Sequence, residues 1–506
     1  MKLNKLFLIG AIALGLVACN NEEEIPTPET EGKYFVSVAF TLSSPQTATR
    51  ANSINPDSQE GTTDETSLAN ASVLVVALKS SDKSYAASQV FPISAFTGTA
   101  TAGQYIPKEE AALPVAELVD YDVWVVTGPQ TLLDNLKTEF DAAPAKLTGK
   151  TVTTALTITD VSALTSAQAF VMSSRSFDNT TPTPAAITAV AKAQDTKAAA
   201  VASRAKVLLD RLVAKATVKV DAAFASTNSS FTATVSGWTL EQGKPQMYTV
   251  MQDKSTANTA KPATIDDNDW NPTSPVVALM NFDTSWGNTP AAFTKVGFVG
   301  AEIKSAPCLY TTENTNTYVN NTNGSANYQL GNTTYALIQV KIQPAALYTD
   351  ETNTTTVNPN TDGTFYYGLA THKFYTTAAA AEVVNGVNTD NTKAGYYTYV
   401  AGMAYYPVWI GQQQDNEAYA PVVRNHAYNL NIMSIIALNK PYDPINPANP
   451  KAPANPADPA NPNDGTNNPD PTPVVPTDPI VSITKYIAAE LQVMPWTAVT
   501  KDVILK

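Results

Sequence analysis

The sequence is poor in the side chains on which most enzymes and disulfide-stabilised proteins depend. Its 506 residues include only two cysteines, Cys19 and Cys308, and two histidines, His372 and His426. Two thiols are too few for a disulfide framework. No Ser–His–Asp or Cys–His arrangement is suggested, and no His-Glu-x-x-His motif, paired Cys-x-x-Cys, P-loop or dinucleotide fingerprint occurs. The sequence therefore gives no case for an enzyme or for a bound cofactor.

Basic residues and long apolar runs are also scarce. The chain has 32 Lys and Arg against 45 Asp and Glu, which gives a net charge of −13. Nucleic-acid binding needs clustered Lys and Arg to displace phosphate counterions, so this class of partner is excluded. After the first 19 residues, no stretch has the ~18 apolar residues needed to span a membrane. Abundant Thr, Asn, Ala and Val favour β-structure with long polar loops.

Three features of the sequence could form a binding or catalytic site. The acidic run Asp266-Asp267-Asn268-Asp269 could offer oxygen ligands to Ca²⁺, but its ligand pattern is incomplete, and we expect a solvated loop instead. An aromatic run could stack against sugars, but we expect it to fill the core and rim of a β-sandwich. Cys308 is expected to be a small buried apolar residue rather than a nucleophile. The aromatic run consists of Tyr396, Tyr397, Tyr399, Tyr405, Tyr406 and Trp409.

The first residues are typical of a bacterial lipoprotein leader. Lys2 and Lys5 form a basic start, residues 6–17 are apolar, and Leu16-Val17-Ala18-Cys19 matches a lipobox. We expect a signal peptide over residues 1–18 and a lipid on the Cys19 thiol, where several acyl chains would give stable anchoring in the outer membrane. The alternative is an ordinary secretory signal with a cysteine there by chance.

Two segments near opposite ends of the chain alternate apolar and other residues with period two, which indicates strands with one buried face. The first has Tyr34, Val36, Val38, Phe40 and Leu42 on one face, and the second has Ala489, Leu491, Val493 and Pro495, followed by Trp496. A trypsin-like cleavage site, Arg50-Ala51, follows the first segment. A chain that can lose one edge strand and offer another to a neighbour could polymerise by strand exchange.

A proline-rich linker precedes the second of these strands. Proline recurs at every third position from Pro441 to Pro462. Polyproline II has three residues per turn, so this stretch would be a semi-rigid spacer of ~65 Å. A passive disordered linker is the alternative. Residues 481–506 are too few to fold alone, so we expect them to dock elsewhere as a donor strand.

The part of the chain between the two end strands is expected to form two tandem β-sandwich domains. The all-β reading divides the chain into a propeptide with the removable strand (19–50), an N-terminal domain (51–230), a C-terminal domain (231–440), a polyproline-type linker (441–480) and a donor segment (481–506). Residues 51–70 are polar and expected to be mobile. We expect a helix over 131–140 with Thr131 as N-cap. The expected strands are 72–78, 121–127, 169–173, 211–220, 328–330, 335–342, 365–375, 396–406 and 427–436.

Several short motifs, taken in order along the chain, resemble a known family. They are Met1–Lys5, Ser37-Val38 with Pro45-Gln46 and Arg50-Ala51, Gly331–Tyr335, Gly368-Leu369 with Lys373–Tyr375, Arg424-Asn425 with Tyr428-Asn429 and Asn431-Ile432, and Val493–Thr497. Their order and spacing are similar to those of the major fimbrillins of Bacteroidales type V pili, above all those of the short (minor) fimbriae of Porphyromonas.

The resemblance implies two transthyretin-like domains and export as a lipoprotein. It also implies cleavage after Arg50 by an Arg-specific surface protease, release of the first strand with its lipid, and filling of the resulting groove by the C-terminal strand of a neighbouring copy. The product would be a cell-surface fimbria used in adhesion, with accessory anchor and tip subunits and host or bacterial surface receptors as further partners.

The sequence leaves open which subunit of such a fimbria the chain would be, and it also leaves open a function outside a fimbria. Because the chain has both a cleavage site and a spare strand, a shaft role is preferred over that of an anchor or tip subunit. The rival is a lipid-anchored adhesin or glycan-binding lipoprotein that stays intact and monomeric, with the aromatic run as its binding platform.

Overall fold

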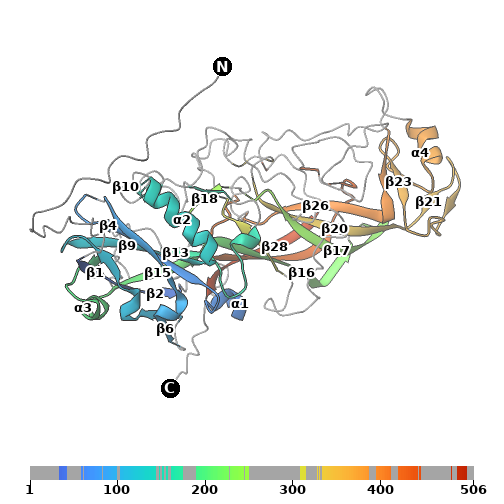
Figure 1. The fold of residues 1–506 in the computed structure, drawn as a ribbon. Helices are drawn as coiled ribbons and strands as arrows, with labels where there is room; N and C mark the ends of the chain where they lie inside the picture. The colour runs from blue at the N-terminus through green and yellow to red at the C-terminus, as the bar shows by residue number, and fades with distance from the viewer. Residues whose placement is uncertain are drawn as a thin grey trace, which may run out of the picture.

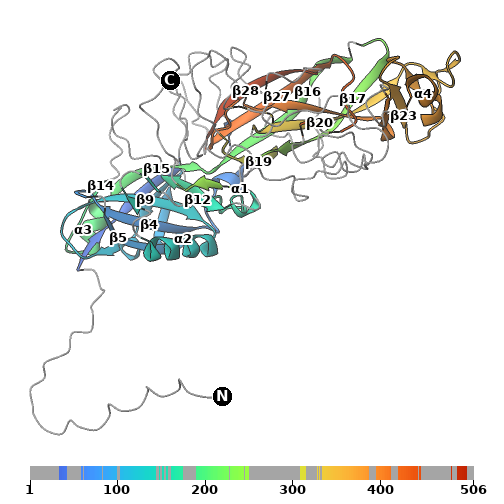
Figure 2. The same ribbon diagram turned by 90° about the horizontal axis from the view of Figure 1, so that it is seen from above.

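The computed structural model describes the chain in a set of ranges separated by gaps. They are residues 33–42, 59–60, 62–82, 84–99, 103–143, 147–148, 151–152, 155–157, 161–174, 190–226, 228–243, 246–249, 308–314, 328, 330, 333–386, 395–411, 420–442, 444–445, 480 and 487–497. The described parts form an elongated molecule in which two β-rich domains lie end to end (Figure 1; Figure 2). The all-β class expected from the sequence is confirmed.

The N-terminal domain contains most of the strands before residue 212. They are β1 (Tyr34–Val36), β2 (Val38–Leu42), β4 (Ser72–Lys79), β5 (Tyr85–Pro92), β6 (Phe96–Thr99), β7 (Gln104–Pro107), β8 (Leu113–Val115), β9 (Asp120–Gly128), β13 (Met172–Ser174), β14 (Val190–Lys192) and β15 (Ala205–Arg211). Nine of them form one sheet in the order β5-β4-β9-β13-β15-β2-β7-β6, with β14 also paired to β9. The short pieces are β10 (Leu147–Thr148), β11 (Thr151–Val152), β12 (Ala155–Thr157) and β18 (Gln246–Tyr248).

The helices of this domain cover its sheet and one of its ends. They are α1 (Thr63–Thr66), α2 (Gln130–Ala142) and α3 (Lys197–Ala202). Helix α2 buries Leu133, Leu136 and Phe140 and packs on β4, β5 and β9. It begins one residue before Thr131, because the carbonyl of Pro129 accepts the first helical hydrogen bonds. Thr131 is therefore inside the helix, and the expectation that it is the N-cap is wrong.

The C-terminal domain is built from two facing sheets and a third at its far end. Its strands are β16 (Val213–Ser226), β17 (Phe231–Glu241), β19 (Cys308–Thr312), β20 (Tyr335–Pro344), β21 (Leu347–Tyr348), β22 (Thr354–Thr355), β23 (Phe365–Gly368), β24 (Phe374–Tyr375), β25 (Tyr396–Tyr399), β26 (Met403–Trp409), β27 (His426–Ile435) and β28 (Ile487–Thr497), joined by β3 (Gln59–Glu60). The sheets have the orders β19-β16-β27-β28-β3, β17-β20-β26 and β22-β21-β24-β23-β25. Helix α4 (Ala378–Asn385) packs on the third sheet.

The core of this domain lies between the first two sheets. Val218 and Leu430 come from one sheet, and Trp238, Ile338 and Tyr406 come from the other; all are essentially inaccessible to solvent. Alternate residues of a strand face opposite sides, so each of these strands contributes every second side chain to the core.

The boundary between the domains lies near Leu212, not near residue 230. The segment 211–220, expected to be one strand, is interrupted at Leu212: β15 ends at Arg211 in the N-terminal sheet, and β16 starts at Val213 in the C-terminal sheet. β16 runs parallel to β27, with Lys215 opposite Ala427 and Val220 opposite Ile432. This pairing spans about two hundred residues, so local alternation could not reveal it.

Other strand expectations are confirmed or corrected in the same way. The strands expected at 72–78, 121–127, 335–342 and 427–436 correspond to β4, β9, β20 and β27. The run 396–406 is divided into β25 and β26, because Ala401 has a positive φ. Tyr328 and Leu330 lie in a bend and a turn rather than in a strand.

Candidate functional site

The segment expected to be removable is an interior strand of the N-terminal sheet. β2 pairs in parallel with β15, where Phe40 lies opposite Val207, and antiparallel with β7, where Phe40 lies opposite Tyr105. β1 continues the same segment and pairs with β8. The description of this segment as an edge strand is therefore wrong, because it has partners on both sides. Its removal would divide the sheet and leave two unpaired strand edges, β15 and β7.

The inward face of this segment lies in the core. Val36, Val38, Phe40 and Leu42 are at most 3% exposed, while Tyr34 is half-buried. The Phe40 ring stacks on Tyr105 with centroids 5.0 Å apart and meets Phe96 edge-on at 5.3 Å. Removing the segment would therefore open an apolar trench lined by aromatic rings. Cys19, Arg50 and Ala51 lie outside the described residues.

The second end strand is observed as β28, over Ile487–Thr497, and its backbone includes the positions of Ala489, Leu491, Val493, Pro495 and Trp496. It pairs antiparallel with β27 of its own chain, from Ile435 opposite Ile487 to His426 opposite Pro495. Its last residues, Trp496 and Thr497, pair with β3. The red strand β28 lies along β27 in Figure 2. In this structure the strand thus covers the edge of its own C-terminal domain.

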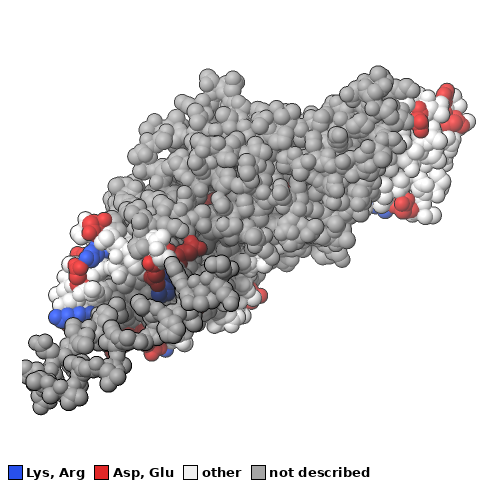
Figure 3. All heavy atoms as spheres, turned by 45° about the horizontal axis from the view of Figure 1, so that its top comes forward, with Lys and Arg blue, Asp and Glu red and all other residues white. Residues whose placement is uncertain are grey.

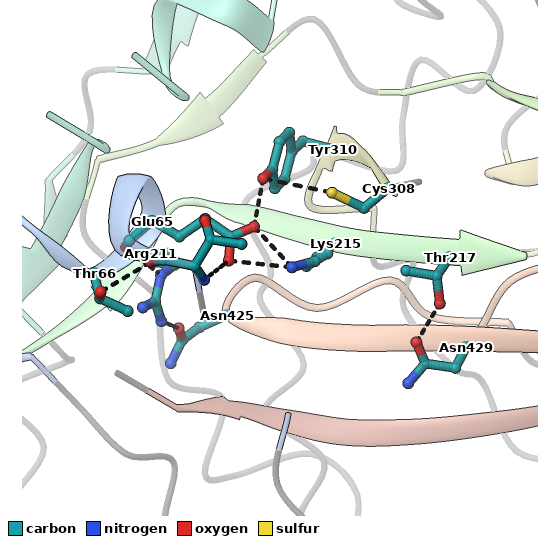
Figure 4. A network of polar contacts seen from close by, with 10 residues as sticks. Glu65, Thr66, Arg211, Lys215, Thr217, Cys308, Tyr310, Asn425 and Asn429 are labelled. Atoms are coloured by element: carbon teal, nitrogen blue, oxygen red, sulfur yellow. Dashed lines mark hydrogen bonds and ion pairs between the residues drawn. The ribbon is translucent and has the colours of Figure 1, made fainter. Parts of the chain in front are cut away.

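A buried ion pair joins the first turn of α1 to the C-terminal domain (Figure 4). The Glu65 carboxylate accepts hydrogen bonds from Lys215 Nζ at 2.8 and 3.1 Å, from the Tyr310 hydroxyl, and from the Thr62 backbone N–H at 2.6 Å. Burial itself raises the pKa of Glu65, but Lys215, Tyr310 and Thr62 together outweigh it and hold this pKa below its usual value. Glu65 is therefore ionised at neutral pH.

A buried arginine continues the network toward the N-terminal domain. Arg211 donates from Nε to the Glu65 carbonyl at 3.2 Å and from a terminal nitrogen to Asn425 Oδ1 at 3.1 Å. Asn425 in turn donates to Asp210 at 2.9 Å. Burial lowers the pKa of Arg211 to about 10, although Glu65 and Asp210 favour its charged form. We call these residues, with Lys215 and Tyr310, the junction network.

The turn before β27 connects the junction network to a second buried ion pair. Arg424 Nε lies 2.7 Å from Glu313 Oε2, and both side chains are at most 3% exposed. The next residue, Asn425, has a φ of 57° and directs its side chain to Arg211 and Asp210. Asparagine tolerates this left-handed conformation better than most residues. The adjacent residues Arg424 and Asn425 thus contact different parts of the molecule: Arg424 pairs with Glu313, and Asn425 binds Arg211 and Asp210.

The junction network was missed at the level of sequence, and the expectation that residues 51–70 are mobile is wrong for the part that the structure describes. The signal was present: Thr62 and Glu65 form a capping box, with a threonine at the N-cap and a glutamate three residues later. What the sequence could not give is the partner, because Lys215 and Tyr310 lie more than one hundred residues away.

The other candidate residues have structural surroundings where they are described. The aromatic run is largely buried: five of its rings are at most 7% exposed and are not available to stack against a sugar, namely Tyr397, Tyr399, Tyr405, Tyr406 and Trp409. Tyr396 is half-buried beside α4. The half-buried Cys308 thiol lies 3.7 Å from the Tyr310 hydroxyl. The Asp266–Asp269 run is outside the described residues. Elsewhere in the described chain, no group of three or more His, Cys, Asp or Glu could hold a metal ion.

The surface and the helices of the described regions complete the picture. Basic and acidic atoms are interspersed over the N-terminal domain on the face shown in Figure 3. Among the helices that the structure describes, none is both long and apolar enough to cross a membrane.

Replacement of Phe40 by alanine should destabilise the uncleaved protein. Loss of a fully buried aromatic ring typically costs about 3–5 kcal/mol, because a cavity replaces its contacts. Urea unfolding of purified precursor should show this loss in the transition of the N-terminal domain. Thr41→Ala, next to it on the half-buried face, is the control and should cost less than ~1 kcal/mol. Equal effects of the two variants would contradict the observed packing.

Replacement of Glu65 by glutamine should leave Lys215 buried without its counter-charge. Removing one partner of a buried ion pair costs about 3–5 kcal/mol, whereas the exposed control Glu110→Gln should change little. The pH dependence follows from the lowered pKa of Glu65. The contribution of the ionised Glu65 carboxylate to stability is complete above the pKa of ~4.3 that the group has in the unfolded chain. This contribution is lost as pH falls through the lower pKa of the folded protein.

Unfolding of wild type and Glu65→Gln between pH 7 and pH 3 checks this expectation. The stability difference should be constant down to about pH 5 and then shrink. A difference that grows below pH 5 would show that the Glu65 carboxyl is not ionised in the folded protein.

Comparisons with known proteins show that the chain is similar to fimbrial subunits. Residues 397–502 match the family model "Major fimbrial subunit protein type IV, Fimbrillin, C-terminal". The whole chain is 27% identical over 524 aligned residues to the minor fimbrium subunit Mfa1 of Porphyromonas gingivalis, with 99% of this chain and 100% of that protein covered.

Solved structures are similar over much of the chain at low identity. One is a fimbrilin (FimA) of P. gingivalis, with 11% identity, a TM-score of 0.37 and coverage of 93% of this chain and 99% of that one. Another is the tip fimbrial protein Mfa3 of P. gingivalis, with 12% identity, a TM-score of 0.29 and coverage of 79% and 94%. The relatives found by sequence are minor fimbrium subunits, in agreement with the expectation of a structural protein rather than an enzyme. Over its whole length the chain is similar to a fimbrium subunit, and the resemblance to fimbrillins inferred from its short motifs is confirmed.

Proposed function

We propose that the chain is a structural shaft subunit of a cell-surface fimbria that contributes to adhesion and polymerises by donor-strand exchange. The observation that carries this proposal is the position of β2. The segment between the lipobox cysteine Cys19 and the cleavage site Arg50 contains an interior strand of the N-terminal sheet. A cut after Arg50 would separate this strand covalently from the rest of the domain.

Loss of β1 and β2 would leave a strongly unfavourable gap. The backbone groups of β15 and β7 that face β2 would lose their partners, and each group left buried and unpaired costs ~1–3 kcal/mol. Each large apolar side chain removed from the trench, such as Phe40, represents ~1.5–3 kcal/mol of burial. A strand of similar alternation would restore both terms. The proposed occupant is β28 of a neighbouring copy, because β28 is long enough and is held on its own domain by pairing with β27 and, at its last two residues, with β3.

The proteolytic step gives the assembly its direction. Before the cut, the chain's own β2 competes for the slot at high effective concentration and keeps the subunit monomeric. We propose export as a lipoprotein through Cys19, arrival at the outer membrane, and cleavage by an Arg-specific surface protease that starts the mature chain at Ala51. Neighbouring copies of the chain are the main partners, and anchor and tip subunits and surface receptors are the remaining ones.

The proposal predicts the behaviour of variants at the cleavage site. Arg50→Ala should abolish the SDS-resistant, high-molecular-weight material on cells, and the protein should accumulate as a monomer that retains Cys19. Arg50→Lys keeps the positive charge but removes the arginine that the protease recognises, so it should behave like Arg50→Ala. Gel analysis with N-terminal sequencing checks this, with wild-type polymer expected to begin at Ala51. Polymer from Arg50→Ala, or wild-type polymer that retains Cys19, would overturn the mechanism.

A further inference from the structure

Both ends of the proline-rich linker meet in one apolar cluster of the C-terminal domain. The cluster lies on the face of sheet β17-β20-β26 that is turned away from the main core, because on β20 Leu337 points into it while its neighbours Ala336 and Ile338 point into the core. Its members include Tyr328, Leu330, Leu337, Tyr405, Ile445 and Ile480. We call it the linker anchor cluster.

Ile480 is firmly seated in this cluster. Its residue is 1% exposed, and its backbone N–H donates to the carbonyl oxygen of Tyr328 at 3.2 Å. Ile445, on the other side of the linker, is fully buried in the same cluster. The two residues that flank 446–479, the stretch that holds most of the prolines, therefore lie in one cluster of the same domain.

The position of Ile480 decides how far β28 can travel. From Ile480 to the start of β28 there are only residues 481–486, which reach at most ~20 Å when fully extended. If Ile480 left its site, the next fixed point would be Ile445, and residues 446–486 would extend on the order of 130 Å as polyproline II. The two cases differ greatly in the spacing and stiffness of a polymer.

We propose that Ile480 remains seated when β28 enters a neighbouring copy, so that residues 481–486 and not the proline-rich linker set the distance between subunits. This inference rests on the proposed strand exchange. A short tether fixed at an apolar anchor holds the donated strand and its parent domain in one geometry. Under this proposal, the proline-rich stretch that we expect to be a semi-rigid spacer does not set the distance between subunits.

Deletion of residues 451–474 gives a direct test with full-length precursor expressed in cells. The ten remaining linker residues still have to connect only Ile445 and Ile480, which share a cluster. We expect fibres with the wild-type axial repeat, measured from electron micrographs. A repeat that shortens or disappears would overturn the proposal, because it would mean that the linker spans the gap between subunits.

Ile480→Asp tests the anchor itself, with Ile480→Val as the matched control. A buried carboxylate would unseat the residue, so we expect an irregular or longer repeat and more sharply bent fibres, whereas Ile480→Val should match wild type. An unchanged repeat in Ile480→Asp fibres would overturn the proposal. If Ile480→Asp fails to fold, the repeat of the deletion variant decides alone. Failure of strand exchange itself would be distinguishable, because wild-type fibres would then be absent or would retain Cys19.

Discussion

The paired backbone of β2 is the constraint on which the other features depend. An interior strand satisfies hydrogen-bonding groups on both of its neighbours, so its place in the sheet must always be filled. In the structure β2 fills it between β15 and β7, with Phe40 in the core. If Cys19 is lipidated and the chain is cut after Arg50, as we propose, this strand would be separated covalently from the rest of its domain. An N-terminal domain that has lost β2 needs another strand, and the far end of the chain offers one.

Two further features would hold the molecule together during the proposed strand exchange. The junction network joins helix α1, through Glu65, to β15, β16, β19 and the turn before β27. Because the network is buried and charged, it favours one arrangement of the segments that it joins. Breaking only some of its contacts would leave buried charges unpaired, which is costly. The linker anchor cluster fixes the point from which the C-terminal strand leaves. In the proposed polymer, a subunit with these two fixed points would hold the next copy in one geometry.

Much of the fold could be predicted from local pattern. The continuous apolar runs of β4 and β9 and the helical spacing of Leu133, Leu136 and Phe140 reflect contacts that a short window of sequence contains. Contacts between distant segments could not be predicted. The parallel pairing of β16 with β27 moves the domain boundary to Leu212, and the pairing of β2 on both edges makes it an interior strand. Glu65 looked like part of a polar loop because its partners are distant, and Ile480 looked like part of a linker because burial of one isoleucine leaves no periodic signal.

The most direct test is disulfide cross-linking within assembled fibres. In a Cys308→Ala background, Val207→Cys on β15 marks the place that β2 occupies, and single cysteines at positions 489, 491, 493 and 495 mark the donated strand. Copies labelled with ¹⁵N and carrying Val207→Cys are mixed with unlabelled copies carrying a donor cysteine. The account predicts that at least one donor position, brought to within the ~4.4–6.8 Å between Cα atoms that a disulfide needs, forms a labelled–unlabelled cross-link. Cross-links at none of the four positions, in fibres that assemble normally, would contradict it.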